Sequence, residues 1–297
     1  MSERQHYPAL IMLAIVSAYA ICFTAIKIGI AYAPPLLFGA LRALIGGVAV
    51  LLTLWWLKVP LWPERKLWPW IFALALSATT INYAAMFLSP GRAGAGIASI
   101  LGNMQPLFIV IMAAIFLGER FSKIDSVSLG LSLVGVVLIS SPALLESSVH
   151  GVTGPLLALV ASISAAVGSI LIKHLAQPSA VLLVTAWQFV IGSFPLFIFS
   201  RVTEQPNYGL MMNLEFIAVL LLLALFGTAF GSVAWYLLIQ RHEIGTLSLG
   251  LFLVPVFGLG TALFFGERLK GIEMLGAGII VMAIFVSLKN SLKIKQT

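Results

Sequence analysis

The sequence predicts an all-α integral membrane protein whose ten transmembrane helices form two inverted five-helix repeats. Three observations predict this fold: the composition, the spacing of the apolar runs, and a self-match between the two halves of the chain. Of the 297 residues, 61% are hydrophobic and 9% are charged, whereas roughly 25% are charged in a soluble domain. The mean hydropathy is +1.09. This composition excludes a soluble enzyme, because so few charges cannot cover a surface that faces water.

Ten apolar runs account for most of the chain. A transmembrane helix needs about 20 mostly apolar residues, and charged residues, prolines and glycines divide the sequence into ten such runs. We expect the spans at residues 8–30, 35–57, 68–89, 94–117, 125–141, 155–173, 179–200, 215–239, 245–265 and 271–288. The first run is too long and too continuous to be a cleavable signal peptide. The single cysteine, Cys22, leaves no disulfide or thiolate metal site to consider.

Lysine and arginine are unequally divided between the two sides of the predicted helices. Eleven fall on the side of the chain termini and five on the other side. By the positive-inside rule the richer side faces the cytoplasm. We therefore expect both termini in the cytoplasm, in the plasma (inner) membrane of a bacterium or archaeon. This topological role also explains the net charge of +7, so we expect no nucleic acid as a partner.

The two halves of the chain repeat each other. Gly118-Glu119-Arg120 follows the fourth span, and Gly266-Glu267-Arg268 follows the ninth, 148 residues later. Further matches occur in the same order: Lys27 with Lys173, Arg42 with Gln188, Met86-Phe87-Leu88 with Trp235-Tyr236-Leu237, Arg92 with Arg241, Pro106 with Pro255, and Gly130 with Gly278. Each half holds five spans, an odd number, so the second half enters the membrane from the opposite side. We expect repeats at residues 1–145 and 151–290, and a cytoplasmic tail at 291–297. Inverted repeats are typical of secondary transporters, which bind substrate between them.

These motifs resemble those of a known family. The run from Pro106 to Arg120, its second copy from Pro255 to Arg268, and the ten-span layout are similar to the EamA-type branch of the drug/metabolite transporter superfamily. The resemblance covers essentially the whole chain. It implies alternating access, with small metabolites, often amino acids, as substrates. The family often carries a Trp-Gly-Ser-Asn-Phe type motif in the first span, where this chain has the segment from Tyr19 to Phe23; Tyr19 is included among the candidate substrate-binding residues.

Prolines at corresponding places in the two halves are the predicted hinges. Such paired interruptions indicate the binding region of a transporter, and here they are Pro106 and Pro255. Each proline removes a helix hydrogen bond and bends its helix, which frees carbonyls one turn earlier for a ligand or a hinge; the alternative is a packing kink. Asn103 and Gln105 are candidate binding residues beside Pro106, because their amides need a cavity or another helix.

Polar and aromatic side chains near the middle of other spans are further candidates for the binding site. Asn82 and Tyr83 belong to a polar patch in the third span, which faces either a cavity or hydrogen-bonding partners on other helices. In the second half the candidates are Ser164, Trp187, Trp235 and Tyr236. Trp55, Trp56, Trp62, Trp68 and Trp70 fit the aromatic belt at the membrane surface. That belt is also the alternative for Trp187 and Trp235.

Arg42 is the one charged residue well inside a predicted span. It follows Pro35 by seven residues, or about 10 Å at the helical rise per residue. Placing arginine at the bilayer centre costs roughly 2.5 to 3.5 kcal/mol. Two interpretations remain open: Arg42 binds a substrate carboxylate, or its side chain snorkels to the surface or caps helix ends.

The other ionisable residues indicate structural roles. Glu119 and Glu267 are expected to cap helices or pair across turns, because they lie at opposite membrane surfaces and cannot act together in catalysis. The acidic and histidine residues fall in loops or at span ends, so no embedded proton relay is predicted. Facilitated diffusion or exchange is the expected mode.

We expect a secondary transporter of small organic metabolites, not an enzyme; amino acids or related zwitterions as substrates, and export as the direction, are implied by the resemblance. One alternative is a translocator of nucleotide sugars or lipid-linked metabolites, although a nucleotide sugar calls for several basic cavity residues and only Arg42 is deep. A membrane enzyme would need paired carboxylates or histidine ligands, which the sequence lacks. The expected partners are a small-molecule substrate and the lipid bilayer, with no cofactor and no metal, and the chain is expected as a monomer or homodimer.

Overall fold

The computed structural model describes the backbone of residues 3–89, 92, 101–146, 152–175, 177, 180–205, 211–264 and 270–294, and every regular element within these ranges is helical. The first half contains α1 (Glu3–Gly29), α2 (Pro35–Trp56), η1 (Arg65–Leu67), α3 (Trp68–Leu74), η2 (Ala75–Ile81), α4 (Asn82–Leu88), α7 (Gln105–Phe116) and α8 (Lys123–Glu146). The second half contains α9 (Thr153–Leu175), α10 (Val181–Thr203), α12 (Leu214–Leu222), η4 (Leu223–Phe230), α13 (Gly231–Arg241), α14 (Ile244–Ser248), η5 (Leu249–Phe252), α15 (Leu253–Phe264) and α16 (Gly271–Ile294).

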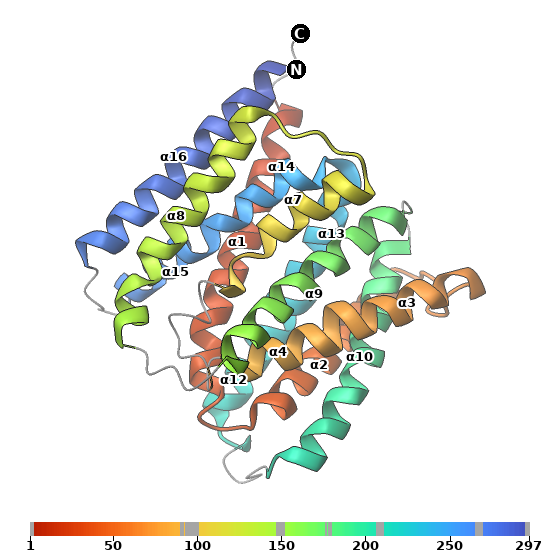
Figure 1. Cartoon of the computed structure of the whole chain (residues 1–297). Coiled ribbons are helices and arrows are strands. Elements are labelled where there is room, and N and C mark those ends of the chain that lie inside the picture. The colour runs from red at the N-terminus through yellow and green to blue at the C-terminus, as the bar shows by residue number, and fades with distance from the viewer. Residues whose placement is uncertain are drawn as a thin grey trace.

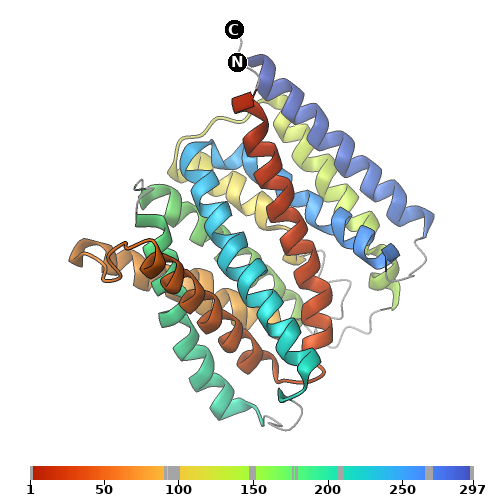
Figure 2. The same ribbon diagram turned by 180° about the vertical axis from the view of Figure 1, so that it is seen from behind.

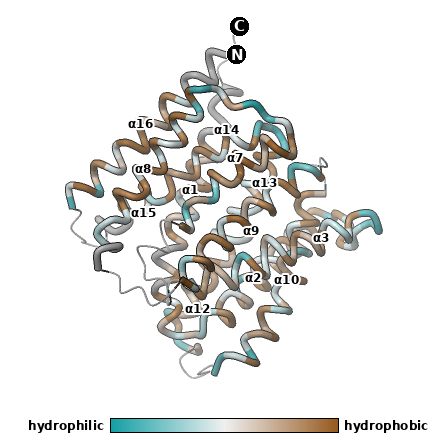
Figure 3. Tube along the Cα trace, in the orientation of Figure 1, coloured by the Kyte–Doolittle hydropathy of each residue, from teal (hydrophilic) through white to brown (hydrophobic). Residues whose placement is uncertain are grey.

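The helices match the predicted spans. Six runs within the described residues are long and apolar enough to cross a membrane, and four shorter apolar runs occupy the other expected spans. The predicted ten-helix fold is confirmed. Some helices extend beyond the apolar stretch: α16 reaches Ile294 and so includes part of the predicted tail. Apolar residues follow the helices, whereas hydrophilic residues gather at several of their ends (Figure 3).

The outer surface suits lipid. Large apolar side chains on separate helices point outward, among them Ile115 at 68% exposure, Val127 at 62%, Ile198 at 64% and Phe285 at 65%. Exposed apolar area of this extent is unusual in soluble monomers. The start of α1 and the end of α16 lie at the same end of the molecule (Figures 1 and 2), as an even number of spans requires.

Equivalent helices of the two repeats pack against each other. The most extensive contacts join α8 to α16 and α2 to α10, which are the fifth and second helices of the two repeats. The pair α8 and α16 lies side by side in Figures 1 and 2. Ser287 of α16 also donates a hydrogen bond to the carboxylate of Asp125 at the start of α8.

Two glycines show that the repeats are related by an internal two-fold axis. A Cβ atom at Gly46 would lie 2.6 Å from Thr228 Cγ2 and 3.0 Å from a backbone oxygen of η4. A Cβ atom at Gly192 would lie 2.5 Å from Thr79 Cβ and 2.7 Å from a backbone oxygen of η2. Gly192 repeats Gly46 after 146 residues, and Thr228 repeats Thr79 after 149. Helix α2 therefore packs on η4 as α10 packs on η2, a reciprocity that defines a two-fold relation.

The elements η2 and η4 are π-helical turns at corresponding places in the two repeats. They contain Thr79 and Thr228, which face the glycines just described. Single π-helical turns are frequent at functional sites. Hydropathy does not reveal them, because a π-helical turn changes the hydrogen-bond spacing of the backbone and not the residue types.

We expect Gly46→Ala to destabilise the fold. The added methyl group would press on Thr228 and on the η4 backbone, and overpacking of this kind typically costs about 1 to 3 kcal/mol. Gly130→Ala on α8 is the matched control, because its Cβ would meet nothing within 4 Å and alanine favours a helix by about 0.5 to 1 kcal/mol. Thermal unfolding of the two purified variants in detergent measures the difference. Equal melting temperatures would show that the close approach is not needed.

Pro106 starts a helix and does not bend one, which corrects the expected kink. Residues 103 and 104 form a turn, and Pro106 lies in the first turn of α7, where its missing N–H has no helical partner to lose. The carbonyl of Leu101 accepts a hydrogen bond of 3.3 Å from the N–H of Met104. Ser162 of α9 lies within hydrogen-bonding distance of the carbonyls of both Leu101 and Gly102, 2.9 Å from Gly102 O.

Pro255 lies within a helical run, as predicted. It follows the 3₁₀ turn η5 and is the third residue of α15. The tighter turn occupies the place of the break before Pro106 in the first repeat. Both predicted hinges therefore lie next to a departure from the regular α-helix: a non-helical turn before Pro106 and a 3₁₀ turn before Pro255.

Candidate substrate site

Arg42 is buried in the protein interior. Its side chain is 5% exposed, so it neither snorkels nor reaches a membrane surface. Nε donates a hydrogen bond of 2.8 Å to Thr228 Oγ1, and Nη2 lies 3.9 Å from Cys22 Sγ. The guanidinium carbon is 5.1 Å from the centre of the Tyr83 ring, a cation–π distance. Helices α1, α2, α4 and η4 therefore meet around this one charge.

Two glycines one turn apart let α1 approach this group. A Cβ at Gly227 would lie 2.1 Å from Cys22 Sγ, and one at Gly231 would lie 2.7 Å from the Tyr19 ring. This Gly-x-x-x-Gly spacing is typical of close helix packing in membranes. Tyr19 is half-buried and shares a hydrogen bond with Ser232.

Tyrosines from both repeats complete the group. Tyr83 Oη is 3.1 Å from Thr228 Oγ1, and Tyr236 Oη accepts a hydrogen bond of 3.4 Å from Gln188 Nε2. Tyr19, Tyr83 and Tyr236 lie close to one another. We name the set the central cluster; its members are Tyr19, Cys22, Arg42, Thr79, Tyr83, Gln188, Thr228 and Tyr236.

Several polar atoms of the central cluster have no partner. Arg42 Nη1, Thr79 Oγ1 and Gln188 Oε1 are buried without a hydrogen bond, and the fourth such side-chain atom within the described residues is Ser132 Oγ on α8. Thr79 and Gln188 are 0% exposed. Leaving a buried polar group unpaired costs about 1 to 3 kcal/mol, and more for a charged one. A polar ligand would therefore gain the most binding free energy by hydrogen-bonding to these atoms.

No carboxylate neutralises Arg42 among the residues that the structure describes. Its contacts there are a hydroxyl, a thiol and an aromatic ring. A buried charge is normally paired, and an unpaired one inside a membrane domain marks a functional site. The guanidinium can bind an anionic oxygen through Nη1. Within the described residues no group of three acidic, histidine or cysteine side chains could hold a metal ion.

Two candidates make hydrogen bonds between helices. Asn82 Nδ2 donates to the carbonyl of Ala161 on α9 at 2.7 Å, and Trp235 Nε1 donates to Ser169 Oγ, also on α9, at 3.0 Å. For Asn82 this geometry is the interhelical alternative considered from the sequence. Both side chains tie α9 to its neighbours and lie outside the central cluster as defined here.

Trp187 packs with tryptophans of the predicted belt. Its ring centre is 5.4 Å from that of Trp62 and 5.8 Å from that of Trp68, and its Nε1 donates to the carbonyl of Leu61 at 2.8 Å. Trp62 is 70% exposed. The structure thus joins Trp187 to the aromatic group beside α3, although the neighbouring Gln188 points to Tyr236.

The remaining candidates lie on α7, α9 and the turn before α7. Ser164 is buried on α9, and Asn103 and Gln105 are half-buried at the turn and at the start of α7. Sequence reasoning missed Thr228, which contacts both Arg42 and Tyr83. Its signals were the Gly-x-x-x-Gly motif around it and its correspondence with Thr79.

Comparisons with known proteins settle the family. The model of the EamA-like transporter family matches this chain twice, at residues 7–141 and 152–289. The chain belongs to the EamA-like transporter family. The two matches follow the two halves in which the structure repeats its helices and its glycine contacts.

Relatives of this EamA-like transporter match over nearly their full length. An uncharacterized transporter of Archaeoglobus fulgidus is 26% identical over 93% of this chain and 96% of its own. A probable amino-acid metabolite efflux pump of Salmonella typhimurium is 27% identical over 97% of this chain and 95% of its own, and one of Escherichia coli is 27% identical over 93% and 92%. A solved crystal structure shares the fold with a TM-score of 0.83 at 19% identity, covering 97% of this chain and 98% of that chain.

In this transporter the first Gly-Glu turn, at Gly118 and Glu119, has a structural role. Gly118 has a φ of 66°, the left-handed conformation that ends a helix, and it places Glu119 beside the next repeat. Glu119 Oε1 and Oε2 accept hydrogen bonds of 2.9 Å each from the backbone N–H groups of Ile244 and Gly245. This confirms helix capping for Glu119; Glu267 lies outside the described residues.

We expect Glu119→Ala to lower stability by about 1 to 2 kcal/mol, because two helix N–H groups lose their acceptor and the helix dipole loses its compensating charge. Glu64→Ala is the matched control, since Glu64 is exposed and pairs only with Lys66 at the surface within the described contacts. Thermal unfolding of both variants in detergent tests this. A Glu119→Ala variant as stable as Glu64→Ala would refute the cap.

Two further carboxylates join the repeats, one at the start of α2 and one at the start of α12. Glu204, just after α10, accepts hydrogen bonds of 2.8 and 3.0 Å from the N–H groups of Leu36 and Leu37 at the start of α2. Tyr32 donates to the carboxylate of Glu215, a bond that raises the pKa of Tyr32. Helix N-termini attract such negative charges, so these carboxylates fix the ends of the transporter's two halves.

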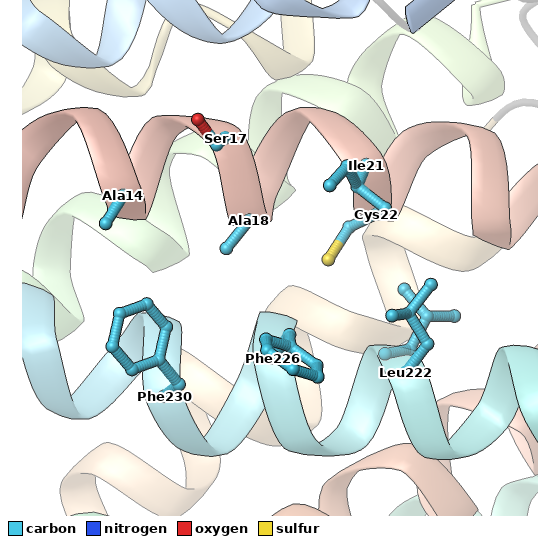
Figure 4. Close-up of a pocket in the computed structure, with 9 residues that line it drawn as sticks. Ala14, Ser17, Ala18, Ile21, Cys22, Leu222, Phe226 and Phe230 are labelled. Carbon is cyan, nitrogen blue, oxygen red and sulfur yellow. The ribbon is translucent and has the colours of Figure 1, made fainter.

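An apolar groove on the outside of the transporter lies close to the central cluster. It has a volume of about 340 Å³ and runs between α1 and the α12–η4 helix. Figure 4 shows Ala14, Ala18 and Cys22 facing Phe230, Phe226 and Leu222 across it. Phe226 is 58% exposed, so the groove opens to lipid. Cys22 lines the groove, and its Sγ also lies 3.9 Å from Arg42 Nη2.

Proposed function

We propose that this transporter exports small carboxylate-bearing metabolites, amino acids or related zwitterions, by alternating access around the central cluster. The observation that carries the proposal is Arg42, a buried guanidinium with an unpartnered Nη1 and no carboxylate among its described contacts. A substrate carboxylate supplies the missing charge and acceptor. The protein moves the substrate across the membrane without changing its covalent structure.

The surroundings of Arg42 support one small anion. Its Nε is held by Thr228 and its face by Tyr83, so the unbonded Nη1 is presented in a fixed direction. One guanidinium balances one carboxylate, whereas a nucleotide diphosphate needs several cations. The outward direction rests on relatives that are named efflux pumps.

The two-fold arrangement supports alternating access. Arg42 and Thr228 come from different repeats, so a substrate held by the central cluster contacts both halves. In inverted-repeat transporters the halves rock about such a central site. The close contacts at Gly46 and Gly192 provide two equivalent pivots between the repeats.

Counterflow in proteoliposomes tests the proposal. Purified protein is reconstituted and loaded with unlabelled solute, and uptake of labelled L-amino acids, of the matching decarboxylated amines and of neutral sugars is measured. We expect saturable counterflow for amino acids and none for amines or sugars. No saturable flux from folded protein, or equal flux for amines that lack the carboxylate, would overturn the proposal.

A further inference from the structure

Thr79 and Gln188 form a second set of unsatisfied polar groups in the central cluster. Both residues are 0% exposed, and Thr79 Oγ1 and Gln188 Oε1 have no hydrogen-bond partner. Thr79 packs on Gly192, one turn along α10 from Gln188. Buried polar atoms in native proteins are nearly always paired. Two orphaned acceptors on adjoining elements therefore suggest a place for a ligand that donates hydrogen bonds.

The internal two-fold axis relates this place to Arg42. Gln188 repeats Arg42, and Thr79 repeats Thr228. In one copy the pair is bonded, because Arg42 Nε donates to Thr228 Oγ1 at 2.8 Å. In the other copy the equivalent atoms, Gln188 Oε1 and Thr79 Oγ1, are both without a partner. The two equivalent places thus differ in chemistry: one offers a cationic donor, the other offers neutral acceptors.

We propose that Thr79 and Gln188 bind the ammonium group of a zwitterionic substrate whose carboxylate binds Arg42. This subsite rests on the proposed function and specifies the second pole of the substrate. An ammonium group has three N–H donors and no acceptor, which complements two oxygen acceptors. The hydrogen bond from Gln188 Nε2 to Tyr236 fixes the amide, so that Oε1 keeps its orientation.

Neutral acceptors also explain how the site keeps Arg42 available. A carboxylate in this region would attract the guanidinium and compete with the substrate, because charges interact strongly at low dielectric. Threonine and glutamine accept hydrogen bonds from an ammonium group without neutralising Arg42. A substrate that binds at both places must therefore carry both a carboxylate and an ammonium group.

The test compares variants that remove one acceptor each with a matched variant elsewhere. Thr79→Val and Gln188→Met remove the acceptors, and Ser132→Ala removes the other unpartnered buried hydroxyl, on α8. Uptake of labelled L-leucine and L-phenylalanine and the other L-amino acids of the panel is measured in proteoliposomes. The competitors are 4-methylpentanoate and 3-phenylpropanoate, which keep the carboxylate and side chain of leucine and phenylalanine and lack the ammonium group.

We expect Thr79→Val and Gln188→Met to raise the KM of the transported amino acids about tenfold. The inhibition constants of the two deaminated acids stay unchanged, and Ser132→Ala alters neither quantity. Equal changes for amino acids and deaminated acids, or unchanged KM values in both variants, would overturn the ammonium subsite while carboxylate transport stands. Absence of saturable flux for every amino acid would overturn the proposed function, and the subsite with it. Melting temperatures of Thr79→Val and Ser132→Ala at or above that of the parent show that the fold is kept.

Discussion

Replacing Arg42 by methionine is expected to reduce kcat/KM for amino-acid transport by up to about 100-fold. The loss follows from removing a charged donor from a buried site, where each such hydrogen bond contributes about 1.5 to 3 kcal/mol and every 1.4 kcal/mol is tenfold. Methionine is unbranched like the arginine stem but shorter, and it carries no charge to bury. Because an unpaired buried charge is removed, stability should be equal or greater. Initial rates in proteoliposomes and melting temperatures in detergent measure the two effects.

Arg42→Lys serves as the conservative comparison. Lysine keeps the positive charge but lacks the planar group that donates from Nε to Thr228 while presenting Nη1. We expect transport between that of the parent and of Arg42→Met, lower than the parent by about tenfold. If Arg42→Met transports amino acids with the KM and rate of the parent, the guanidinium does not bind the substrate.

Thr228→Val is expected to destabilise the protein by about 3 kcal/mol, whereas Thr79→Val is not. Thr228 Oγ1 accepts from Arg42 Nε and bonds to Tyr83 Oη, so valine leaves a charged and a neutral group unpaired. Thr79 is its repeat equivalent and makes no hydrogen bond, so the same substitution removes an unsatisfied hydroxyl and should be neutral or stabilising. Unfolding in detergent compares the two isosteric changes directly.

The pair of threonine variants distinguishes two causes of instability. If packing at the π-helical turns dominated, the two variants would lose similar stability, because each threonine faces an equivalent glycine. If hydrogen bonding to Arg42 dominates, as we expect, only Thr228→Val is affected. Equal losses would contradict the assigned role of Thr228.

The general fold was predictable because its causes are local. Long apolar runs define membrane helices through their length alone, and an odd number of spans per repeat forces inversion. The capping role of Glu119 was also predictable in outline, since a glycine that ends a helix and a following carboxylate are local signals. The N–H donors that Glu119 caps, those of Ile244 and Gly245, however, lie in the other repeat.

The backbone irregularities were only partly predictable. Proline indicated that the fourth span is not a regular helix, yet the break precedes Pro106, and Ser162 of α9 bonds to the carbonyls of Leu101 and Gly102 there. The π-helical turns around Thr79 and Thr228 had no sequence signal of their own. Both features depend on which helix lies alongside, and that is a property of packing.

The sequence by itself determined the helices, their inverted repetition and the single deep charge of Arg42, because hydrophobicity and charge act residue by residue. Only the tertiary structure decided what surrounds that charge: Thr228 and Tyr83 as its partners, Asn82 and Trp235 bonded to α9, and Thr79 and Gln188 without partners. The physical reason is that a buried polar group is satisfied by neighbours on other helices. The neighbours of each group depend on how the helices cross, and the close glycine contacts allow these crossings. How two helices cross cannot be predicted from either helix alone.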